Sequence, residues 1–336
     1  MSGIEKLEQR RSEPMRELER TAPIRERALE GRQTQDVAER LRGSDTESPG
    51  SRLTSPSAPQ GPSLRRGQKI SAHRLLSLTE KQVGRYQRRI QSQAQLARLV
   101  DKLSLEVAVV DRPAGGSGTT TGDHYTGYRM ADGRIAFVVG DGMGHDAAAA
   151  RDSATLAAHL ADDGVAAKTF TVGVTADIAL ARLSQDVLPH FNPRDRMMAA
   201  ALLIVDPVRG QIDFANAGLP VELLIRKASG EVVRISQRGG PLGDSDFGYD
   251  ATHGHHQRQL DLGDTIVLPT DGLADAMVPD SAEHNLTALA ERLARAPSGR
   301  PDMLAKELHR AAGATGSDDA TALILRWRRA AGRPTT

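Results

Sequence analysis

Short apolar runs, separated by glycine and aspartate turns, begin at Leu105 and continue to Arg326. Several alternate apolar with polar residues, which is typical of strands with one buried face. The runs arrive in hairpin-like groups and do not alternate one-to-one with helical patterns, so they favour an α+β fold with antiparallel sheets over a doubly wound parallel fold. The predicted strands are Leu105–Val110, Arg134–Val139, Ala200–Val205, Gln211–Ala215, Glu222–Arg226, Val232–Ile235, Gln257–Leu262, Thr265–Leu268 and Thr321–Arg326.

Longer stretches with helical spacing of apolar residues predict helices over Ala147–Leu160, Val174–Leu188, Glu283–Ala294 and Met303–Ala312. The chain before the first strand is different in composition. We expect residues 1–70 to form a charged, disordered or weakly helical arm that ends in a linker rich in Ser, Pro and Gly. Residues 71–103 predict a helical linker, and residues 104–330 the folded domain.

An apolar stripe runs along the predicted helical linker, formed by Val83, Tyr86, Ile90, Ala97 and Val100 at spacings of three and four residues, with the polar Gln93 as the one interruption. Such a stripe suits a helix that packs on the following domain as an N-terminal cap. It equally suits a helix that pairs with a second copy of the chain as a homodimer.

Composition limits the chemistry of the chain. It contains no cysteine, which excludes disulfides, thiolate catalysis and Cys-ligated zinc and fits a reducing compartment. No apolar run reaches 18 residues and the N-terminus has no signal-like apolar region, so we expect a cytoplasmic protein that does not cross a membrane. The net charge is +1, but residues 51–100 contain ten Lys/Arg against the single acid Glu80. Aromatic residues make up only 3%, so nucleic-acid binding by this basic stretch is the weaker interpretation beside a solvated linker.

Four aspartate-containing segments stand at the ends of apolar runs. Asp141 and Asp271 each follow a strongly apolar predicted strand, and Asp318 and its neighbour Asp319 precede the last one. Asp123 belongs to the segment before the second predicted strand. Carboxylates without cysteine or a convincing histidine set favour hard cations such as Mg²⁺ or Mn²⁺ over Zn²⁺.

Each aspartate considered alone can also be explained as part of a turn, because an Asp-Gly pair in a protein is most often a turn. Asp132-Gly133 is predicted to be such a turn. The observation that favours a metal site is the set of acids at strand ends, and residue patterns alone leave both interpretations open.

The order of the motifs resembles the SpoIIE-type branch of the PPM metal-dependent serine/threonine protein phosphatases over about residues 95–328. The matching segments are TGDHY (121–125), GDGMGHDAAAA (140–150), ALLIVDP (201–207), FANAGLP (214–220), GGPLG (239–243), LDLGDTIVLPTDGLADA (260–276) and SDDAT (317–321). The resemblance implies an αββα sandwich of two antiparallel sheets flanked by helices, with two Mn²⁺ or Mg²⁺ ions and no other cofactor. It implies attack by a metal-activated water on a phosphoserine or phosphothreonine, without a phosphoenzyme.

Carried over position by position, the resemblance implies a role in metal binding for each principal acid. Asp141 looks like the carboxylate that bridges both metals, and the carbonyl of Gly142 like a ligand of the second. Asp271 and Asp318 look like ligands of the first metal, and Asp123 like the acid of the opening motif. Asp141 and Asp271 are therefore the expected catalytic residues, with Asp319 in a supporting position.

The family's usual substrate predicts the partner. A bacterial partner-switching pathway is implied, in which a serine-phosphorylated anti-anti-sigma (STAS-domain) protein is dephosphorylated. The alternative is a catalytically weak phosphatase-fold module that sequesters a regulatory partner, because Thr126 stands where family members often have a second acid. Among the histidines, His145 is expected to pack or cap a helix rather than act as general acid. His253, His255 and His256 are expected on an exposed loop.

Overall fold

The computed structural model describes residue 75 and residues 77–114, 120–144, 146–191, 196–244, 246, 248–277, 285–313 and 318–328. In this part of the chain two five-stranded sheets form, and all pairings between their strands are antiparallel. The predicted arm, residues 1–70, lies outside the described residues. Sheet A has the order β1 (Leu105–Arg112), β10 (Ala320–Trp327), β9 (Thr265–Pro269), β6 (Leu223–Arg226) and β7 (Val232–Ile235). Sheet B has the order β2 (Asp123–Arg129), β3 (Ile135–Gly142), β4 (Met198–Asp206), β5 (Gln211–Ala217) and β8 (His256–Gln259).

The two sheets face each other across a continuous apolar core. Alternation along the strands puts one set of side chains into this layer, because successive residues of a strand point to opposite faces. The largest buried members from sheet B are Phe137, Leu203 and Phe214, and sheet A contributes Ile266 and Leu325. The strands' other faces are apolar as well, so each sheet needs a second covering layer.

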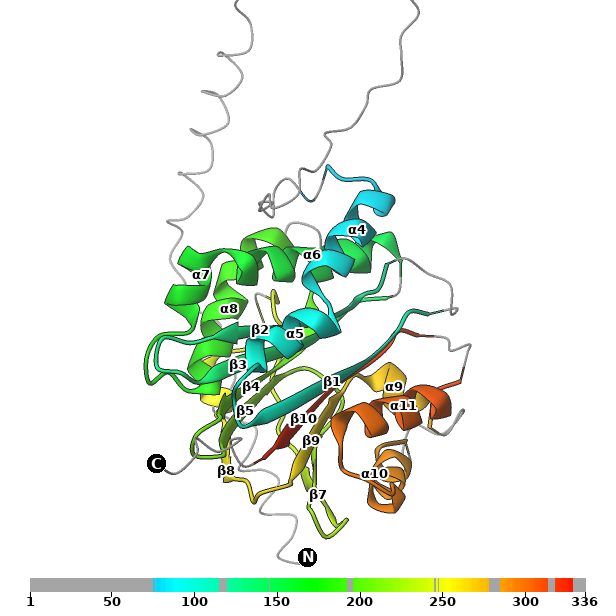
Figure 1. The fold of residues 1–336 in the computed structure, drawn as a ribbon. Coiled ribbons are helices and arrows are strands. Elements are labelled where there is room, and N and C mark those ends of the chain that lie inside the picture. Colours follow the sequence, from blue (N-terminus) through cyan, green and yellow to red (C-terminus); the bar gives the residue numbers. More distant parts are fainter. Residues whose placement is uncertain are drawn as a thin grey trace, which may run out of the picture. The chain divides into compact units, whose positions relative to one another are not determined.

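Helices supply that layer on both sides, as Figure 1 shows. Sheet B is covered through a second core by α6 (Ala147–Ala161), α7 (Asp163–Thr169) and α8 (Ala176–Phe191). Sheet A is covered through a third core by α9 (Asp271–Asp275), α10 (Asn285–Arg295) and α11 (Pro301–Ala311). The predicted αββα sandwich of antiparallel sheets is confirmed.

The helical segment before the sandwich consists of two helices in its described part. Helix α4 (Glu80–Ile90) and helix α5 (Gln93–Val100) are separated at Gln91 and Ser92, where the continuous helix expected from the apolar stripe is interrupted. The Ser92 hydroxyl accepts a hydrogen bond from the Gln95 N–H (3.2 Å) and so caps the start of α5.

The chain itself covers most of the predicted apolar stripe; Ala97 is exposed, and Leu96, which was not part of the predicted stripe, is buried. Val83 and Tyr86 of α4 pack on the alanine-rich helix α6, and Leu96 and Val100 of α5 join the core between the sheets. Helix α4 therefore lies on the same helix that follows the Asp141–Gly142 segment. Among the described helices, none combines the length and hydropathy that crossing a bilayer requires.

Candidate metal centre

The two sheets end close together at the loops that contain the predicted ligand residues. Asp123 and Asp141 lie directly opposite each other on β2 and β3. Asp271 begins α9 directly after β9, and Asp318 lies two residues before β10. A hydrogen bond from Thr270 Oγ1 to Asp123 Oδ2 (3.0 Å) joins the end of β9 to the start of β2. The structure thus brings the predicted acids from four chain segments to one end of the two sheets.

Asp123 is the most deeply buried of these acids, at 1% exposure. Its Oδ2 accepts the Thr270 hydroxyl, whereas its Oδ1 makes no hydrogen bond of good geometry with any described residue. Burial raises the pKa of Asp123 well above its usual range, and the neighbouring Asp141 carboxyl raises it further, whereas the nearby Thr321 hydroxyl lowers the pKa of this carboxyl. An ionised carboxylate in this position needs a donor or a counter-charge at Oδ1, because an unpaired buried charge is costly.

Asp141 and Asp271 are partly buried and share a hydrogen bond between their carboxyl groups. Burial, followed by the charges of Asp271 and Asp318, raises the pKa of Asp141 to about 8. Burial also raises the pKa of Asp271. In the absence of a cation, the pair therefore holds a proton near neutral pH, as two carboxyls at close range do.

Asp319 has a different environment from its neighbour Asp318. It is 3% exposed, and its two carboxylate oxygens accept hydrogen bonds from the Ala114 N–H and the Gly122 N–H, both at 2.7 Å. Asp318 is only partly buried, and its Oδ1 accepts from the Asp319 N–H (2.8 Å). Asp319 therefore ties the end of β1 and the start of β2 to the loop before β10. This geometry is that of a supporting residue, with both oxygens already occupied.

Glycines allow the loops to approach each other. At Gly272 an added Cβ would lie 2.0 Å from the carbonyl oxygen of Asp319, a contact with backbone that no rotamer relieves. At Gly122 an added Cβ would lie 2.6 Å from the carbonyl oxygen of Gly144. The main chain also connects Gly122 to the predicted ligand Gly142, whose N–H donates to the Gly122 carbonyl (3.1 Å).

The structure adds residues that the sequence patterns did not indicate. Thr270 is fully buried and contacts both sheets through one hydroxyl. His124 is fully buried beside Asp123, and burial lowers its pKa to about 3, so its ring is neutral. A threonine that ends an apolar strand just before Asp-Gly was the available signal for Thr270. For His124 the sequence held no comparable signal, because a histidine next to an acid is common on surfaces.

The histidines of the 253–256 segment make their polar contacts elsewhere in the structure. His145 lies outside the described residues. His255 Nδ1 lies 3.0 Å from Asp177 Oδ1, and His253 Nδ1 lies 3.3 Å from Asp250 Oδ1. All three histidines of the 253–256 segment are exposed, and each of the two ion pairs is made with a separate acid.

At the acidic end, the arrangement of the side chains and the chemistry of their donor atoms differ in how well they suit a bound cation. Within the described ranges, no group of three or more acidic or histidine side chains is arranged around one point as the ligands of a cation would be. The donor set nevertheless fits a hard divalent cation, since it consists of oxygens only and includes the unpaired Oδ1 of Asp123. Burial, and after it the charges of neighbouring carboxyls, raise the pKa of Asp123, Asp141 and Asp271. The chemistry of these donors therefore favours a hard divalent cation at the acidic end.

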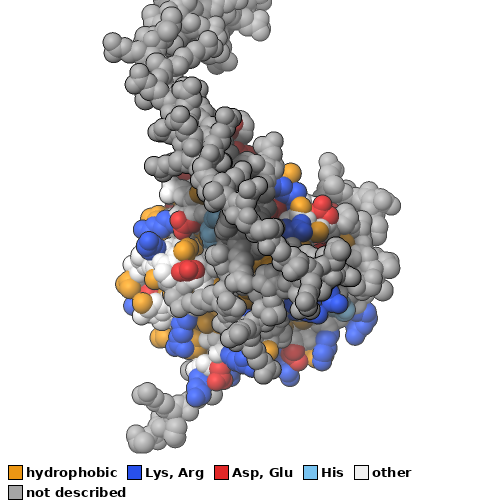
Figure 2. Space-filling view, turned by 90° about the horizontal axis from the view of Figure 1, so that it is seen from above, with side chains coloured by type: hydrophobic (Ala, Val, Ile, Leu, Met, Phe, Trp, Pro, Cys, Tyr) orange, Lys and Arg blue, Asp and Glu red, His pale blue; other side chains and the backbone are white. Residues whose placement is uncertain are grey.

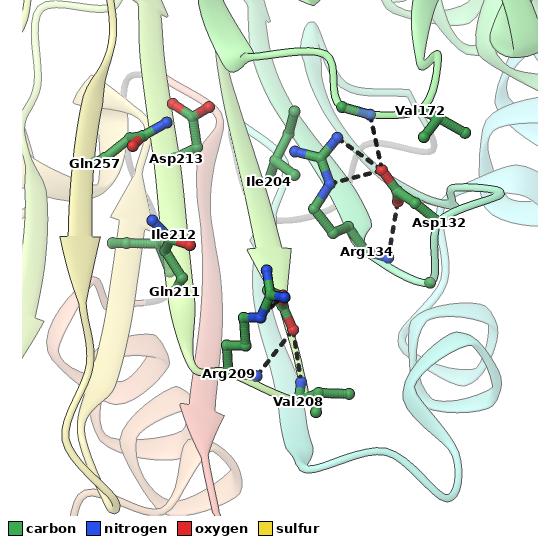
Figure 3. A pocket seen from close by; sticks show the side chains of 13 residues that line it. Asp132, Arg134, Val172, Ile204, Val208, Arg209, Gln211, Ile212, Asp213 and Gln257 are labelled. Atoms are coloured by element: carbon green, nitrogen blue, oxygen red, sulfur yellow. Dashed lines mark hydrogen bonds and ion pairs between the residues drawn. The ribbon is translucent and has the colours of Figure 1, made fainter.

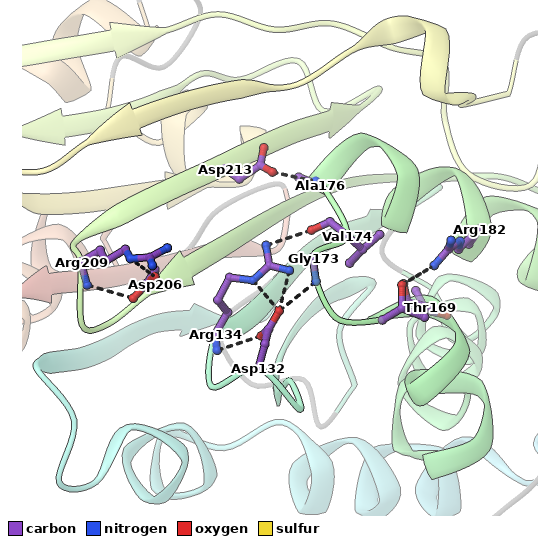
Figure 4. A network of polar contacts seen from close by, with 11 residues as sticks. Asp132, Arg134, Thr169, Gly173, Val174, Ala176, Arg182, Asp206, Arg209 and Asp213 are labelled. Carbon is purple, nitrogen blue, oxygen red and sulfur yellow. Dashed lines mark hydrogen bonds and ion pairs between the residues drawn. The ribbon is translucent and has the colours of Figure 1, made fainter.

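A pocket of about 500 Å³ lies at the opposite end of sheet B, between the β2–β3 turn, the β4–β5 turn and the loop before α8 (Figure 3). Its polar groups are largely paired with one another. Arg134 forms an ion pair with Asp132 (2.8 Å) and donates to the Val174 carbonyl (2.9 Å), and Asp213 accepts from the Ala176 N–H (3.1 Å) (Figure 4). These contacts stabilise turns and the start of α8. The acidic end is therefore the better candidate site.

Sandwich topology and acidic loops together define a PPM-type serine/threonine phosphatase fold. The sequence model of the stage II sporulation protein E (SpoIIE) family matches residues 131–328, more than half of the chain. The chain belongs to the SpoIIE family. The matched range includes Asp141, Asp271 and Asp318 and begins after Asp123.

Solved structures of similar fold come from several bacteria. The RsbU and RsbW domains of Mycobacterium tuberculosis Rv1364c are 24% identical with a TM-score of 0.57, covering 68% of this chain and 61% of that one. The SiaA-PP2C domain of Pseudomonas aeruginosa is 22% identical with a TM-score of 0.57, covering 76% and 98%. The PP2C phosphatase domain of Bacillus subtilis SpoIIE with a fragment of its regulatory domain is 18% identical with a TM-score of 0.52, covering 67% and 64%.

At these identities the likeness concerns the fold. The chain spans less than two thirds of the Mycobacterium tuberculosis and Bacillus subtilis chains. No curated protein matches the sequence.

Proposed function

We propose that this protein is a Mn²⁺- or Mg²⁺-dependent phosphatase that hydrolyses phosphoserine or phosphothreonine in a protein substrate. The observation that supports this function best is the gathering of Asp123, Asp141, Asp271 and Asp318 at one end of the sandwich, with a buried carboxylate oxygen of Asp123 unpaired. Membership of the SpoIIE family supports the same reaction class.

Each acid has a task in this proposal. Two cations, when bound, would lower the pKa of a water molecule and neutralise charge on the phosphate. Asp141, Asp271 and Asp318 with the carbonyl of Gly142 would hold them, and Asp123 would add its free Oδ1. The Asp141–Asp271 pair gives up its shared proton on binding, because carboxylate ligands bind cations in the ionised form. Thr270 and Asp319 keep the loops in place and do not touch the substrate.

The proposed substrate is a serine-phosphorylated anti-anti-sigma protein with a STAS domain. Support comes from family membership and from the fold shared with the RsbU domain of the mycobacterial protein. A partner-switching role of this kind would place the protein in the cytoplasm. Figure 2 shows basic side chains interspersed with acidic and hydrophobic ones among the coloured residues of the face that it draws.

Homodimerisation through residues 71–103 stays a prediction. Val83 and Tyr86 are buried within the chain, so a dimer would have to use other side chains of this segment. Size-exclusion chromatography with light scattering measures the mass directly.

The first test is hydrolysis of p-nitrophenyl phosphate with Mn²⁺ by wild type, Asp141→Asn and Asp271→Asn. We expect each substitution to lower kcat at least 100-fold, because it removes a charged ligand and one member of the proton-sharing pair. Asp302→Asn is the matched control, since Asp302 is exposed and pairs only with Arg300 on the surface of α11. Equal rates in all four proteins would refute the assignment of the centre.

The alternative function is a catalytically weak module that sequesters its partner, which Thr126 at the position of the second motif acid favours. A phosphorylated STAS protein distinguishes the two. Release of inorganic phosphate over many turnovers supports the phosphatase, whereas stoichiometric complex formation without phosphate release supports the binding module.

A further inference from the structure

Helix α4 and the residue that caps its end bury two glutamines beside sheet B and α6. Gln87 belongs to α4, Gln91 directly follows its last residue, and their exposures are 2% and 6%. A buried amide group is costly unless its donors and acceptor are hydrogen-bonded. The hydrogen-bond partners of these two amides therefore indicate the structural role of Gln87 and Gln91.

Gln87 bonds to the main chain two residues before Asp123. Its Nε2 donates to the Thr121 carbonyl (2.7 Å) and to the Ala150 carbonyl of α6 (3.3 Å). Its Oε1 accepts from the Thr121 N–H (3.4 Å). One side chain thus pairs with both main-chain groups of Thr121 and with the first turn of α6.

Gln91 bonds to Asp123 itself and to its neighbours. Its Nε2 lies 2.7 Å from His124 Nδ1, 3.1 Å from Ser153 Oγ and 3.4 Å from the Asp123 carbonyl oxygen. Ser153 of α6 donates to the same Asp123 carbonyl (2.9 Å). Since the amide nitrogen of Gln91 can only donate, His124 Nδ1 is the acceptor of this bond.

The two amides connect both chain segments that lead to the predicted ligands. On one side they hold Thr121 and Asp123 at the start of β2. On the other side they hold Ala150 and Ser153 of α6, the helix that begins five residues after Gly142. The apolar contacts of Val83 and Tyr86 with α6 keep α4 in the position from which the amides reach both segments.

We propose that Gln87 and Gln91 are positioning residues that fix the main chain at Asp123 and thereby set the cation affinity of the acidic centre. This inference rests on the proposed function. The glutamines do not touch the substrate or the cations. They hold the backbone of Asp123, whose Oδ1 makes no hydrogen bond among the described residues. A displacement of α4 therefore reaches Asp123 through the side chain of Gln91.

The test compares Gln87→Met and Gln91→Met in the full-length protein. Methionine keeps the unbranched shape and approximate volume of glutamine and removes the donors and the acceptor. Mn²⁺ affinity is measured by electron paramagnetic resonance of free Mn²⁺, without substrate. We expect the Kd to rise about 10- to 100-fold in both variants, the usual loss when an outer partner of a metal ligand is removed. Activity at saturating Mn²⁺ should recover most of the wild-type kcat.

Gln93→Met is the matched control. Gln93 also donates from Nε2 to a main-chain carbonyl, that of Val107 at 2.8 Å, but Val107 is on β1 and this bond is exposed. We expect an unchanged Mn²⁺ Kd for this variant. Circular dichroism and thermal unfolding without metal show whether each variant is folded. If the substitutions acted only through a general loss of stability, Tm would fall in all three variants and their Mn²⁺ Kd values would not differ from one another.

The outcomes separate the two hypotheses. If wild type binds Mn²⁺ and turns over substrate while folded Gln87→Met and Gln91→Met bind it equally well, the inference is overturned and the proposed function stands. A wild type that neither binds Mn²⁺ nor hydrolyses phosphate overturns the proposed function, and the inference with it. Should a methionine variant fail to fold, Ser153→Ala removes one donor to the Asp123 carbonyl at lower cost to packing, and an unchanged Kd in that variant overturns the inference.

Discussion

The two carboxylate oxygens of Asp123 have different surroundings. Oδ2 accepts the hydroxyl of Thr270, and Oδ1 is buried and makes no hydrogen bond within the described part of the chain. Thr270 in turn accepts the Thr321 N–H at 3.0 Å, so one hydroxyl joins the ends of β9 and β10 to β2. Orientation of the free oxygen therefore depends on a side chain from the other sheet.

Thr270→Val tests this dependence, because valine has the same shape and lacks the hydroxyl. We expect a rise of about tenfold or more in the Mn²⁺ concentration needed for half-maximal activity. Unfolding should be easier by about 1–3 kcal/mol, since the buried Thr321 N–H loses its acceptor. Thr252→Val removes a similar hydroxyl bond to Asp250 on the surface and should leave the Mn²⁺ dependence unchanged. Identical Mn²⁺ titrations for the two variants would contradict the role of Thr270.

At the scale of elements, the centre depends on close crossings of loops. Helix α9 begins at Asp271, and its second residue, Gly272, lies against the main chain of Asp319. Asp319 holds Gly122 and Ala114 through its carboxylate. The segment before β10 is thus fixed between α9 and the start of β2.

Gly272→Ala should disrupt this crossing. Its Cβ would lie 2.0 Å from a carbonyl oxygen, so the segment around Asp318 must shift. We expect loss of most Mn²⁺-dependent activity and a cost of about 1–3 kcal/mol in stability, as for other overpacked sites. The control is Gly164→Ala in α7, where the added Cβ meets only the end of a side chain, Asp162 Oδ1 at 3.2 Å. If urea unfolding and activity of the two variants agreed, the crossing would be looser than described.

Most elements were predictable because apolar periodicity marks them. The strands with continuous apolar runs, such as β3 and β4, and the four longer helices agree with prediction to within three residues at each end. Strand β2 was not predicted, because it alternates Tyr125 and Gly127 with polar residues and pairs through its backbone. The short helices α7 and α9 were missed because their length gives no periodicity.

The acidic residues of the candidate site could be predicted from the sequence, but the residues that hold them in position could not. Asp141 and Asp271 follow apolar strands, which is a local pattern. Gln87 and Gln91 look like ordinary polar positions of a helix, and only the packing of α4 on α6 buries them. Their contacts with residues 34 and 32 positions away along the chain follow from tertiary structure.

At the scale of the whole molecule, the acidic end makes stability depend on pH. In the folded protein without cations the pKa of Asp141 is about 8, against 3.8 for an unperturbed aspartate. The folded state then binds more protons than the unfolded state between these values, so stability falls as pH rises through this range. Neutral His124, with a pKa lowered to about 3 from 6.5, has the opposite effect, which is complete above pH 6.5.

The effect of Asp141 on stability can be measured separately from that of His124 between pH 6.5 and 8, because the His124 effect no longer changes there. In EDTA we expect the Tm of wild type to decrease across this window, and Mn²⁺ to restore it increasingly as pH rises, because protons compete with the cation. Asp141→Asn, which cannot ionise, should show a flatter profile and be more stable than wild type at pH 8 without metal. Parallel Tm profiles for the two proteins in EDTA would rule out Asp141 as the titrating group.

The pairing of β1 with β10 has a consequence for synthesis of the protein. The first strand of sheet A pairs with the last strand of the chain, and Asp318 lies two residues before that last strand. A nascent chain that still lacks β10 has neither a closed sheet A nor the complete set of acids. Under the proposed function, phosphate hydrolysis would therefore begin only once β10 has left the ribosome, and an unfinished chain could not act on its substrate.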